Sequence, residues 1–305
     1  MIWFIGAILL ETVAAGIVVQ ALKSHRDTKL PAWFACSVVT ALSPCLVPTS
    51  SPYLRLLSSL WAIALLVKLY DLLKTDERLL SAAWDYYLAW LPNVFWLVLR
   101  RQPEPVSGGV DWRRLPGELA KTVAGLLLLI VCFLVNWAPL PFFVEHCVKA
   151  LAVIAAMVPA SQLVAVIWRL MGGKAEDPMR RPFQSATPAE FWKRWNLPAQ
   201  EFLFEHAYRP AARVLPPAGA LLVTFAVSGL IHEYVFGIAS GKSQSGQMAF
   251  FLVQGFATAA TNHLRPTGSQ RRIAQGLTIT FQLVTSLLFF QGVNSVVPFY
   301  VHRGP

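Results

Sequence analysis

Long runs of apolar residues recur along the 305-residue chain, and they constrain its fold more than any other feature. A run of about 20 apolar residues lets a helix cross the roughly 30 Å hydrocarbon core of a bilayer. Charged residues make up only 14% of the chain, against about 25% in soluble domains, which excludes a soluble enzyme. We therefore expect an all-α integral membrane fold, with residues 1–305 forming a single membrane-embedded domain. About eight transmembrane helices are predicted, at residues 2–22, 32–48, 53–73, 119–137, 142–170, 216–238, 248–264 and 274–300.

A ninth stretch, residues 81–99, is rich in tryptophan and tyrosine, which is typical of segments at the membrane interface. If it does not cross the membrane, four alternate loops share one side and hold 21 of the 26 lysine and arginine residues. These loops are residues 23–31, 74–121, 169–213 and 265–272. The positive-inside rule assigns that side to the cytoplasm. We interpret residues 81–99 as an interfacial or re-entrant segment.

The cytoplasmic loop at residues 172–215 contains a predicted amphipathic helix. Thr187 and Glu190 match a capping box, and Pro188 falls at the first helical position. The helix should end or kink near Leu197, because Pro198 is not tolerated deep in a regular helix. On a helical wheel one apolar arc holds Phe191, Trp192, Trp195 and Asn196, whereas Lys193 and Arg194 lie elsewhere. This pattern is typical of a helix lying at the membrane surface.

Two polar residues in apolar surroundings are the candidates for chemistry. Asn196 is either functional or a capping or core asparagine satisfied locally, because a buried amide needs hydrogen-bond partners. His232 lies in an apolar span, where ionisable residues usually mark function. The alternative is a packing histidine bonded to a backbone carbonyl. Ser228 and Gly229, one turn earlier, leave room beside the imidazole for a substrate or another helix. Because imidazole can accept a hydroxyl proton near pH 7 and an amide can polarise a carbonyl, this pair is compatible with acyl transfer.

Three motifs in this region resemble those of the membrane-bound O-acyltransferases. They are FWKRWN at 191–196, continuing as LPAQEFLFEHAYRP to residue 210, VSGLIHE at 227–233, and FFLVQG at 250–255. The resemblance covers about residues 185–260 and is closest to the wax synthase branch. It implies a multi-helix fold with a tunnel where acyl-CoA and a lipid alcohol meet. It also implies that Asn196 and His232 are the two catalytic residues.

The other motif residues are then expected to serve the substrates or support the site. The candidates for binding the acyl donor or acceptor are Trp192, Trp195, Lys193, Arg194, Ser228 and Gly229. Glu233 lies about 100° from His232 around the helix, which favours a supporting structural role. The phosphates of CoA suit Arg180, Arg181 and Arg209 as well as Lys193 and Arg194, although membrane topology alone also explains this charge. Acyl-CoA is expected as a substrate and not as a cofactor. No metal or nucleic acid is expected.

Local pattern gives structural readings for several other polar residues. Glu145 and Lys149 have the spacing of an ion pair within one helix. Glu11 is expected to pair with another helix. His206 and His263 are both expected at the surface.

We therefore expect an enzyme that transfers a fatty acyl group from acyl-CoA to a long-chain alcohol, yielding a wax-type ester. Diacylglycerol, a sterol or a terpenoid remain alternative acceptors. A rival class is a membrane transporter or scaffold, in which His232, Glu11, Lys68 and Glu233 would form a polar path. The expected location is the endoplasmic reticulum in a eukaryote or the inner membrane in a bacterium.

Overall fold

A computed structural model describes residues 1–24, 29–75, 83–103 and 108–301, and all regular structure in these ranges is helical. Seven helices are long and apolar enough to cross a membrane. They are α1 (Ile2–Ser24), α2 (Lys29–Leu42) with its continuation η1 (Ser43–Leu46), α3 (Pro52–Leu73), α6 (Gly108–Leu134), α7 (Phe142–Leu170), α11 (Pro217–Ser240) and α13 (Gly268–Val296). The predicted all-α, multi-pass membrane fold is confirmed.

The remaining predicted span, residues 248–264, is not among these seven helices. It forms α12 (Gly246–Thr261), whose 16 residues give a length of about 24 Å, less than the roughly 30 Å of a hydrocarbon core. Residues 81–99 also form no long helix. Their described part contains only the seven-residue α5 (Trp84–Trp90) followed by turns, as a segment that does not cross the membrane would, and residues 81–82 lie outside the described residues.

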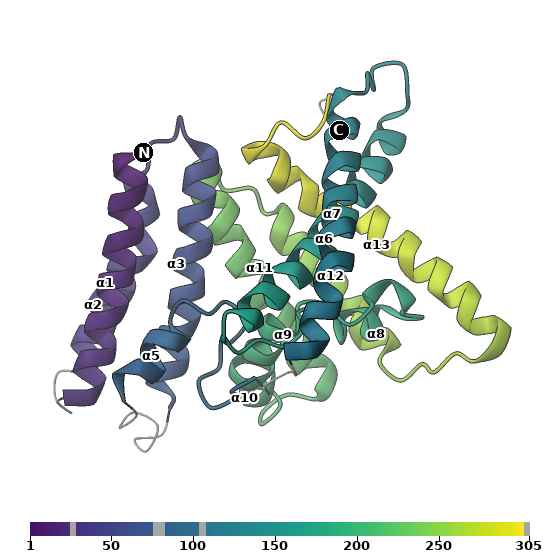
Figure 1. Cartoon of the computed structure of the whole chain (residues 1–305). Helices are drawn as coiled ribbons and strands as arrows, with labels where there is room; N and C mark the ends of the chain where they lie inside the picture. Colours follow the sequence, from purple (N-terminus) through teal and green to yellow (C-terminus); the bar gives the residue numbers. More distant parts are fainter. Residues whose placement is uncertain (25–28, 76–82, 104–107, 302–305) are drawn as a thin grey trace.

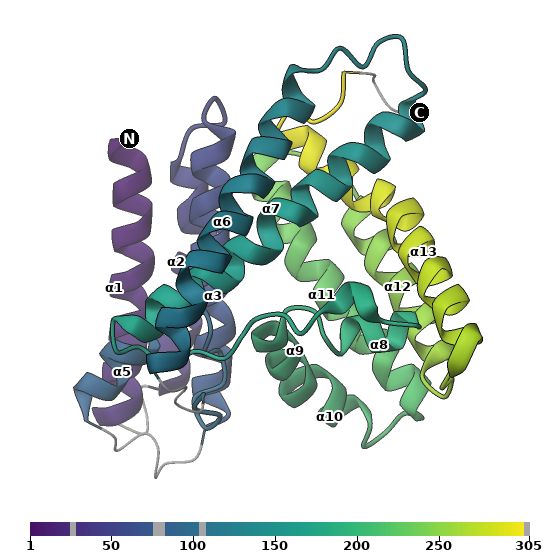
Figure 2. The same cartoon turned by 45° about the vertical axis from the view of Figure 1, so that its right-hand side comes forward.

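The long helices form three groups (Figure 1). Helices α1, α2 and α3 pack together as an N-terminal bundle, while α6 and α7 run side by side as a hairpin. Helices α11, α12 and α13 form a C-terminal bundle, which joins the N-terminal bundle where α11 packs on α3. Figure 2 shows the short helices of the loop at residues 172–215 lying across one end of the C-terminal bundle. We call this segment the motif loop.

Buried polar contacts fix the start of the motif loop. The Arg169 side chain at the end of α7 is 4% exposed, and it donates to both carboxylate oxygens of Asp111 on α6 at 2.7 and 2.8 Å. The same guanidinium donates to the Ala175 carbonyl at 3.1 Å. A charge-assisted bidentate pair is among the stronger side-chain contacts. The hairpin therefore holds the segment that leads into α8.

The structural readings of the other polar residues are confirmed, with one exception. Lys149 Nζ lies 2.6 Å from Glu145 Oε1, and Ser58 donates to Glu11 at 2.7 Å. His263 is exposed. The prediction for His206 is wrong, because its side chain is only 7% exposed and its Nε2 lies 2.6 Å from Asp71 Oδ1 on α3.

Candidate active site

The first α-helix of the motif loop begins where the sequence predicts. Helix α8 (Pro188–Trp192) is capped by Thr187, whose hydroxyl accepts from the Glu190 amide at 3.0 Å. Glu190 reaches back to the Ala186 amide at 2.8 Å. The capping contact at Thr187 is confirmed, but the predicted end of the helix is wrong, because α8 stops at Trp192.

The helical structure is interrupted at residues 193–196, because Pro198 lies in a second helix. Helix α9 (Leu197–Leu203) carries Pro198 in its first turn, where the missing amide costs no hydrogen bond. Asn196 precedes this helix with φ +47°, a left-handed conformation that asparagine tolerates better than most residues. Its side chain is exposed and makes no capping bond. The predicted arc of Asn196 with the tryptophans is therefore wrong, since these residues do not share one helix.

Trp192 connects α8 to the C-terminal bundle. Its indole Nε1 donates to Gln254 Oε1 on α12 at 2.9 Å. Gln254 is fully buried and donates in turn to Gln282 and Thr285 on α13, at 2.9 and 2.8 Å. Sequence reasoning missed Gln254, although it is the glutamine of the quoted motif FFLVQG and a polar residue in an apolar helix. This network fixes α8 against both α12 and α13.

His232 projects from α11 into an aromatic environment. Its ring centroid lies 4.4 Å from that of Phe251 and 5.7 Å from that of Phe289. Nδ1 lies 2.8 Å from the Ser228 carbonyl oxygen, which can only accept, so Nδ1 carries the proton. In the neutral ring Nε2 is then an acceptor, and it has no hydrogen-bond partner in the described part of the chain. The carbonyl contact also suits a packing histidine, but the unoccupied Nε2 has the form of a general base.

The small residues beside His232 serve helix packing. A Cβ on Gly229 would lie 2.9 Å from Met248 Sδ and 3.2 Å from its Cα, so the space at Gly229 admits α12. Glu233 accepts from the Met248 amide at 3.0 Å, in the first turn of α12, where a negative charge is favourable. Ser228 contributes its backbone carbonyl to the imidazole. The space beside Gly229 was expected to hold a substrate or another helix, and in the described structure it is filled by α12.

The cationic and aromatic candidates in the motif loop mostly have protein partners. Trp195 stacks on Phe191 with centroids 5.3 Å apart. Lys193 donates to Asn262 at 2.9 Å, and Arg194 pairs with Glu190. Among the other proposed CoA contacts, Arg209 pairs with Glu205 at 2.8 Å and Arg180 with Glu176 at 3.2 Å, whereas Arg181 is exposed.

The structure thus brings some of the predicted residues together. Trp192 and His232 both contact Phe251, with centroids 5.9 and 4.4 Å apart, so the motif loop reaches the histidine through one ring. Asn196 is exposed between α8 and α9, and no hydrogen bond joins it to His232 among the described residues.

The second half of the chain is similar to a known protein family. Residues 160–296, which include α8, Gln254 and His232, match the model of the membrane-bound O-acyltransferase family. The matched segment, which is slightly less than half of the chain, is therefore similar to this family. The N-terminal bundle and most of the hairpin lie outside the matched residues.

Curated proteins that are similar to this chain include three from plants. An acyl-CoA–sterol O-acyltransferase 1 from Arabidopsis thaliana is 28% identical, over 63% of this chain and 60% of the relative. A probable long-chain-alcohol O-fatty-acyltransferase 2 from Arabidopsis thaliana is 32% identical, over 40% of each chain. A long-chain-alcohol O-fatty-acyltransferase from Simmondsia chinensis is 33% identical, over 34% of each. The resemblance to the wax synthase branch is confirmed, and the chain spans 34% to 60% of these three relatives.

Proposed function

We propose that the protein transfers a fatty acyl group from acyl-CoA to the hydroxyl group of a long-chain alcohol, as residues 1–305 forming one membrane-embedded enzyme. The observation that carries this proposal is the hydrogen bond of 2.8 Å between His232 Nδ1 and the Ser228 carbonyl. It fixes the tautomer in which Nε2 accepts a proton. The family match over residues 160–296 and the names of the three relatives support the acyl-transfer chemistry.

In the proposed reaction His232 Nε2 accepts the proton of the alcohol while the alcohol oxygen attacks the thioester carbonyl. The carbon–sulfur bond then breaks, and the imidazolium returns its proton to the departing CoA sulfur. The products are an ester and free CoA, so neither a metal nor a redox partner is needed. The rings of Phe251 and Phe289 limit the access of water, which would otherwise compete as the acceptor.

Asn196 is proposed to position the acyl donor. CoA is polar and must remain near the surface while its acyl chain enters the protein, and Asn196 is an exposed residue of the motif loop. The exposed Arg181 is the more available cation for the CoA phosphates, because Arg180, Arg194 and Arg209 already pair with glutamates. In this proposal the motif loop faces the cytoplasm, in the endoplasmic reticulum or a bacterial inner membrane.

A sterol is the second candidate acceptor, because the relative with the longest alignment of the three is named for that activity. Diacylglycerol and terpenoid acceptors remain sequence-based alternatives. The transporter alternative gains no support from the polar residues on which it depended. Glu11 bonds to Ser58, Lys68 to the Asn93 carbonyl and Glu233 to the Met248 amide, so these three do not form a shared polar path.

The test is ester formation by the purified protein with labelled palmitoyl-CoA and a panel of alcohols that includes hexadecanol and a sterol. His232→Gln is expected to lower kcat by at least about a hundredfold, because general base catalysis contributes roughly 10²–10⁴. Asn196→Ala is expected to act mainly on KM for palmitoyl-CoA.

His263→Ala is the matched control, because His263 is an exposed histidine without an assigned role. Its activity should equal that of the wild type. Full activity in a folded His232→Gln protein would refute the catalytic assignment. No CoA release with any acceptor would refute the proposed reaction and favour transport assays.

A further inference from the structure

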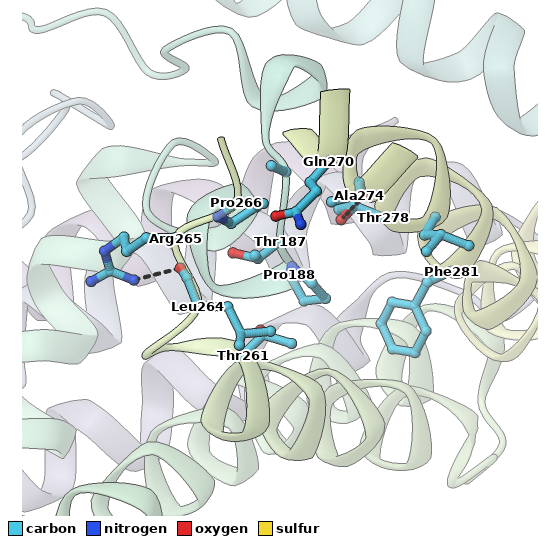
Figure 3. Close-up of a pocket in the computed structure, with 12 residues that line it drawn as sticks. Thr187, Pro188, Thr261, Leu264, Arg265, Pro266, Gln270, Ala274, Thr278 and Phe281 are labelled. Carbon is cyan, nitrogen blue, oxygen red and sulfur yellow. Dashed lines mark hydrogen bonds between the residues drawn. The ribbon is translucent and has the colours of Figure 1, made fainter. Parts of the chain in front are cut away.

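A cleft of about 490 Å³ lies between the start of α8, the end of α12 and the first half of α13 (Figure 3). This volume is within the range of small-molecule sites. His232 is not one of the lining residues, so the cleft is separate from the aromatic environment of the imidazole. None of its lining residues was singled out for substrate binding from the sequence.

The cleft is polar on one side and apolar on the other. The Gln270 amide points toward Thr187 and Pro188, whereas the ring of Phe281 lies on the opposite side (Figure 3). Arg265 turns its guanidinium away and donates to the Leu264 carbonyl at 2.8 Å. A ligand with a neutral hydrogen-bonding group and a hydrocarbon chain matches this arrangement better than an anion does.

The outer rim of the cleft is continuous with an apolar surface. Leu277, which lines the cleft, is 67% exposed, and Ile273 one turn earlier is 66% exposed. In a membrane protein such residues face lipid. A lipid can therefore enter the cleft from the hydrocarbon region without crossing water.

One face of α13 connects the cleft with the catalytic candidate. Thr278 and Phe281 line the cleft, Gln282 and Thr285 bind Gln254 one turn further, and Phe289 contacts the His232 ring. These positions follow helical spacing, and residues 278 and 289 are separated by about 16 Å along the axis. On α12 the matching face carries Thr261 at the cleft and Phe251 at His232.

A buried hydroxyl without a partner lies between these two ends. Thr258 is 5% exposed, and its Oγ1 makes no hydrogen bond in the described part of the chain. It follows Gln254 by one turn and precedes Thr261 by another. Because an unsatisfied buried hydroxyl is costly, Thr258 has the form expected of a group that binds a polar ligand atom.

We propose that this cleft is the entry site of the acceptor, a lipid with one hydroxyl group and a hydrocarbon chain. The hydroxyl meets Gln270 and Thr187 first and Thr258 deeper in, while the chain lies against Phe281 and Leu277. That the bound lipid is the acyl acceptor rests on the proposed acyl transfer. The binding itself does not depend on catalysis.

The first experiment measures binding alone. His232→Ala protein is labelled with hexadecanol carrying a photoreactive diazirine, and the labelled peptides are mapped by mass spectrometry. Label is expected within residues 261–281. Ala274→Phe should abolish this label because Ala274 lines the cleft, whereas Val284→Phe is the matched control that adds the same ring at an exposed position of α13 outside the cleft. Label elsewhere, or label unchanged by Ala274→Phe, would overturn the proposal.

The second experiment separates acceptor from donor by steady-state kinetics. Ala274→Phe is expected to raise KM for hexadecanol about tenfold or more and to leave KM for palmitoyl-CoA within about twofold. Thr258→Val should lower kcat/KM for hexadecanol, with rescue by Thr258→Ser. A rise in KM for palmitoyl-CoA instead would assign the cleft to the donor and refute the proposal. If His232→Gln kept full activity while cleft labelling persisted, the catalytic assignment would fall and the lipid site would stand.

Discussion

Two histidines on membrane-spanning helices, His146 and His232, differ in a way that matters for chemistry. His146 on α7 has both ring nitrogens engaged, with Nδ1 2.6 Å from the Tyr300 hydroxyl and Nε2 2.9 Å from the Leu283 carbonyl. His232 has only Nδ1 engaged in the described structure, at 2.8 Å from the Ser228 carbonyl. A histidine that uses both nitrogens for packing has no site left to accept a proton. The free hydrogen-bonding capacity of Nε2 therefore distinguishes the catalytic candidate.

Glu201 on α9 gives a pH-dependent prediction. Burial raises its pKa from 4.5 to about 7, while Arg101 lowers it and Glu176, Glu205 and Asp71 raise it further. Because the folded pKa lies above the unfolded value, the folded state binds more protons between about pH 4.5 and 7, and stability falls as pH rises through this range.

Glu201→Gln removes the titrating group and should remove this loss. We expect the variant to gain in Tm relative to the wild type as pH rises from 5 to 8, measured by thermal unfolding in detergent. Glu118→Gln is the matched control, because Glu118 is an acidic residue that is not among the charges acting on Glu201 and that pairs with the exposed Lys121. A Tm difference that does not change with pH would contradict the assignment.

At the scale of elements, the sequence was sufficient for the long helices and insufficient for the motif loop. Runs of apolar residues predicted α1, α3 and α7 to within a few residues, because helix length is set by the membrane. The end of α8 was missed since the helical wheel assumed one helix up to Pro198. Proline also suits a first helical turn, so the same residue allowed a new helix to begin at Leu197.

Contacts between distant elements were beyond local pattern. The buried His206–Asp71 pair joins residues 135 positions apart, and nothing near His206 in the sequence indicates it. The Trp192–Gln254 bond likewise joins α8 to α12 across 62 positions. His232 and Asn196 were found because their motifs are local. Whether they act together stays a prediction.

The close contact between α11 and α12 predicts the effect of a single methyl group. Gly229→Ala would place a Cβ 2.9 Å from Met248 Sδ and 3.2 Å from Met248 Cα. Overpacking of this kind costs about 1–3 kcal/mol. Because α12 also carries Phe251, which contacts His232, we expect kcat to fall together with Tm.

Gly276→Ala on α13 is the matched control, because a Cβ at Gly276 meets no atom within 4 Å. It should leave Tm unchanged or raise it slightly, since alanine is the better helix former by roughly 1 kcal/mol. The double variant Gly229→Ala with Met248→Ala should recover part of the lost activity. Equal effects of the two glycine substitutions would show that helix propensity, and not the α11–α12 contact, is responsible.

At the scale of the whole molecule, the hairpin is joined to the rest through a few buried polar contacts. His146 binds Leu283 on α13 and Tyr300 beyond it. Lys149 donates to the Phe299 carbonyl at 2.6 Å, and Glu145 accepts from the Val301 amide at 2.8 Å. The segment after α13 is thus held by α7. The pair of Glu145 and Lys149 therefore links two groups of helices in addition to satisfying its own charges.

This link gives the final prediction. Lys149→Met removes the ammonium group that lies 2.6 Å from the fully buried Glu145 carboxylate, and breaking a buried pair in this way costs about 3–5 kcal/mol. Replacing both charges, as Lys149→Met with Glu145→Gln, should recover much of that loss in thermal unfolding. Lys121→Met is the matched control, because the Lys121 side chain is 62% exposed in its pair with Glu118 and such pairs contribute about 0–1 kcal/mol. If Lys149→Met and Lys121→Met lowered Tm equally, the buried pair would have no special part in holding the hairpin to the C-terminal bundle.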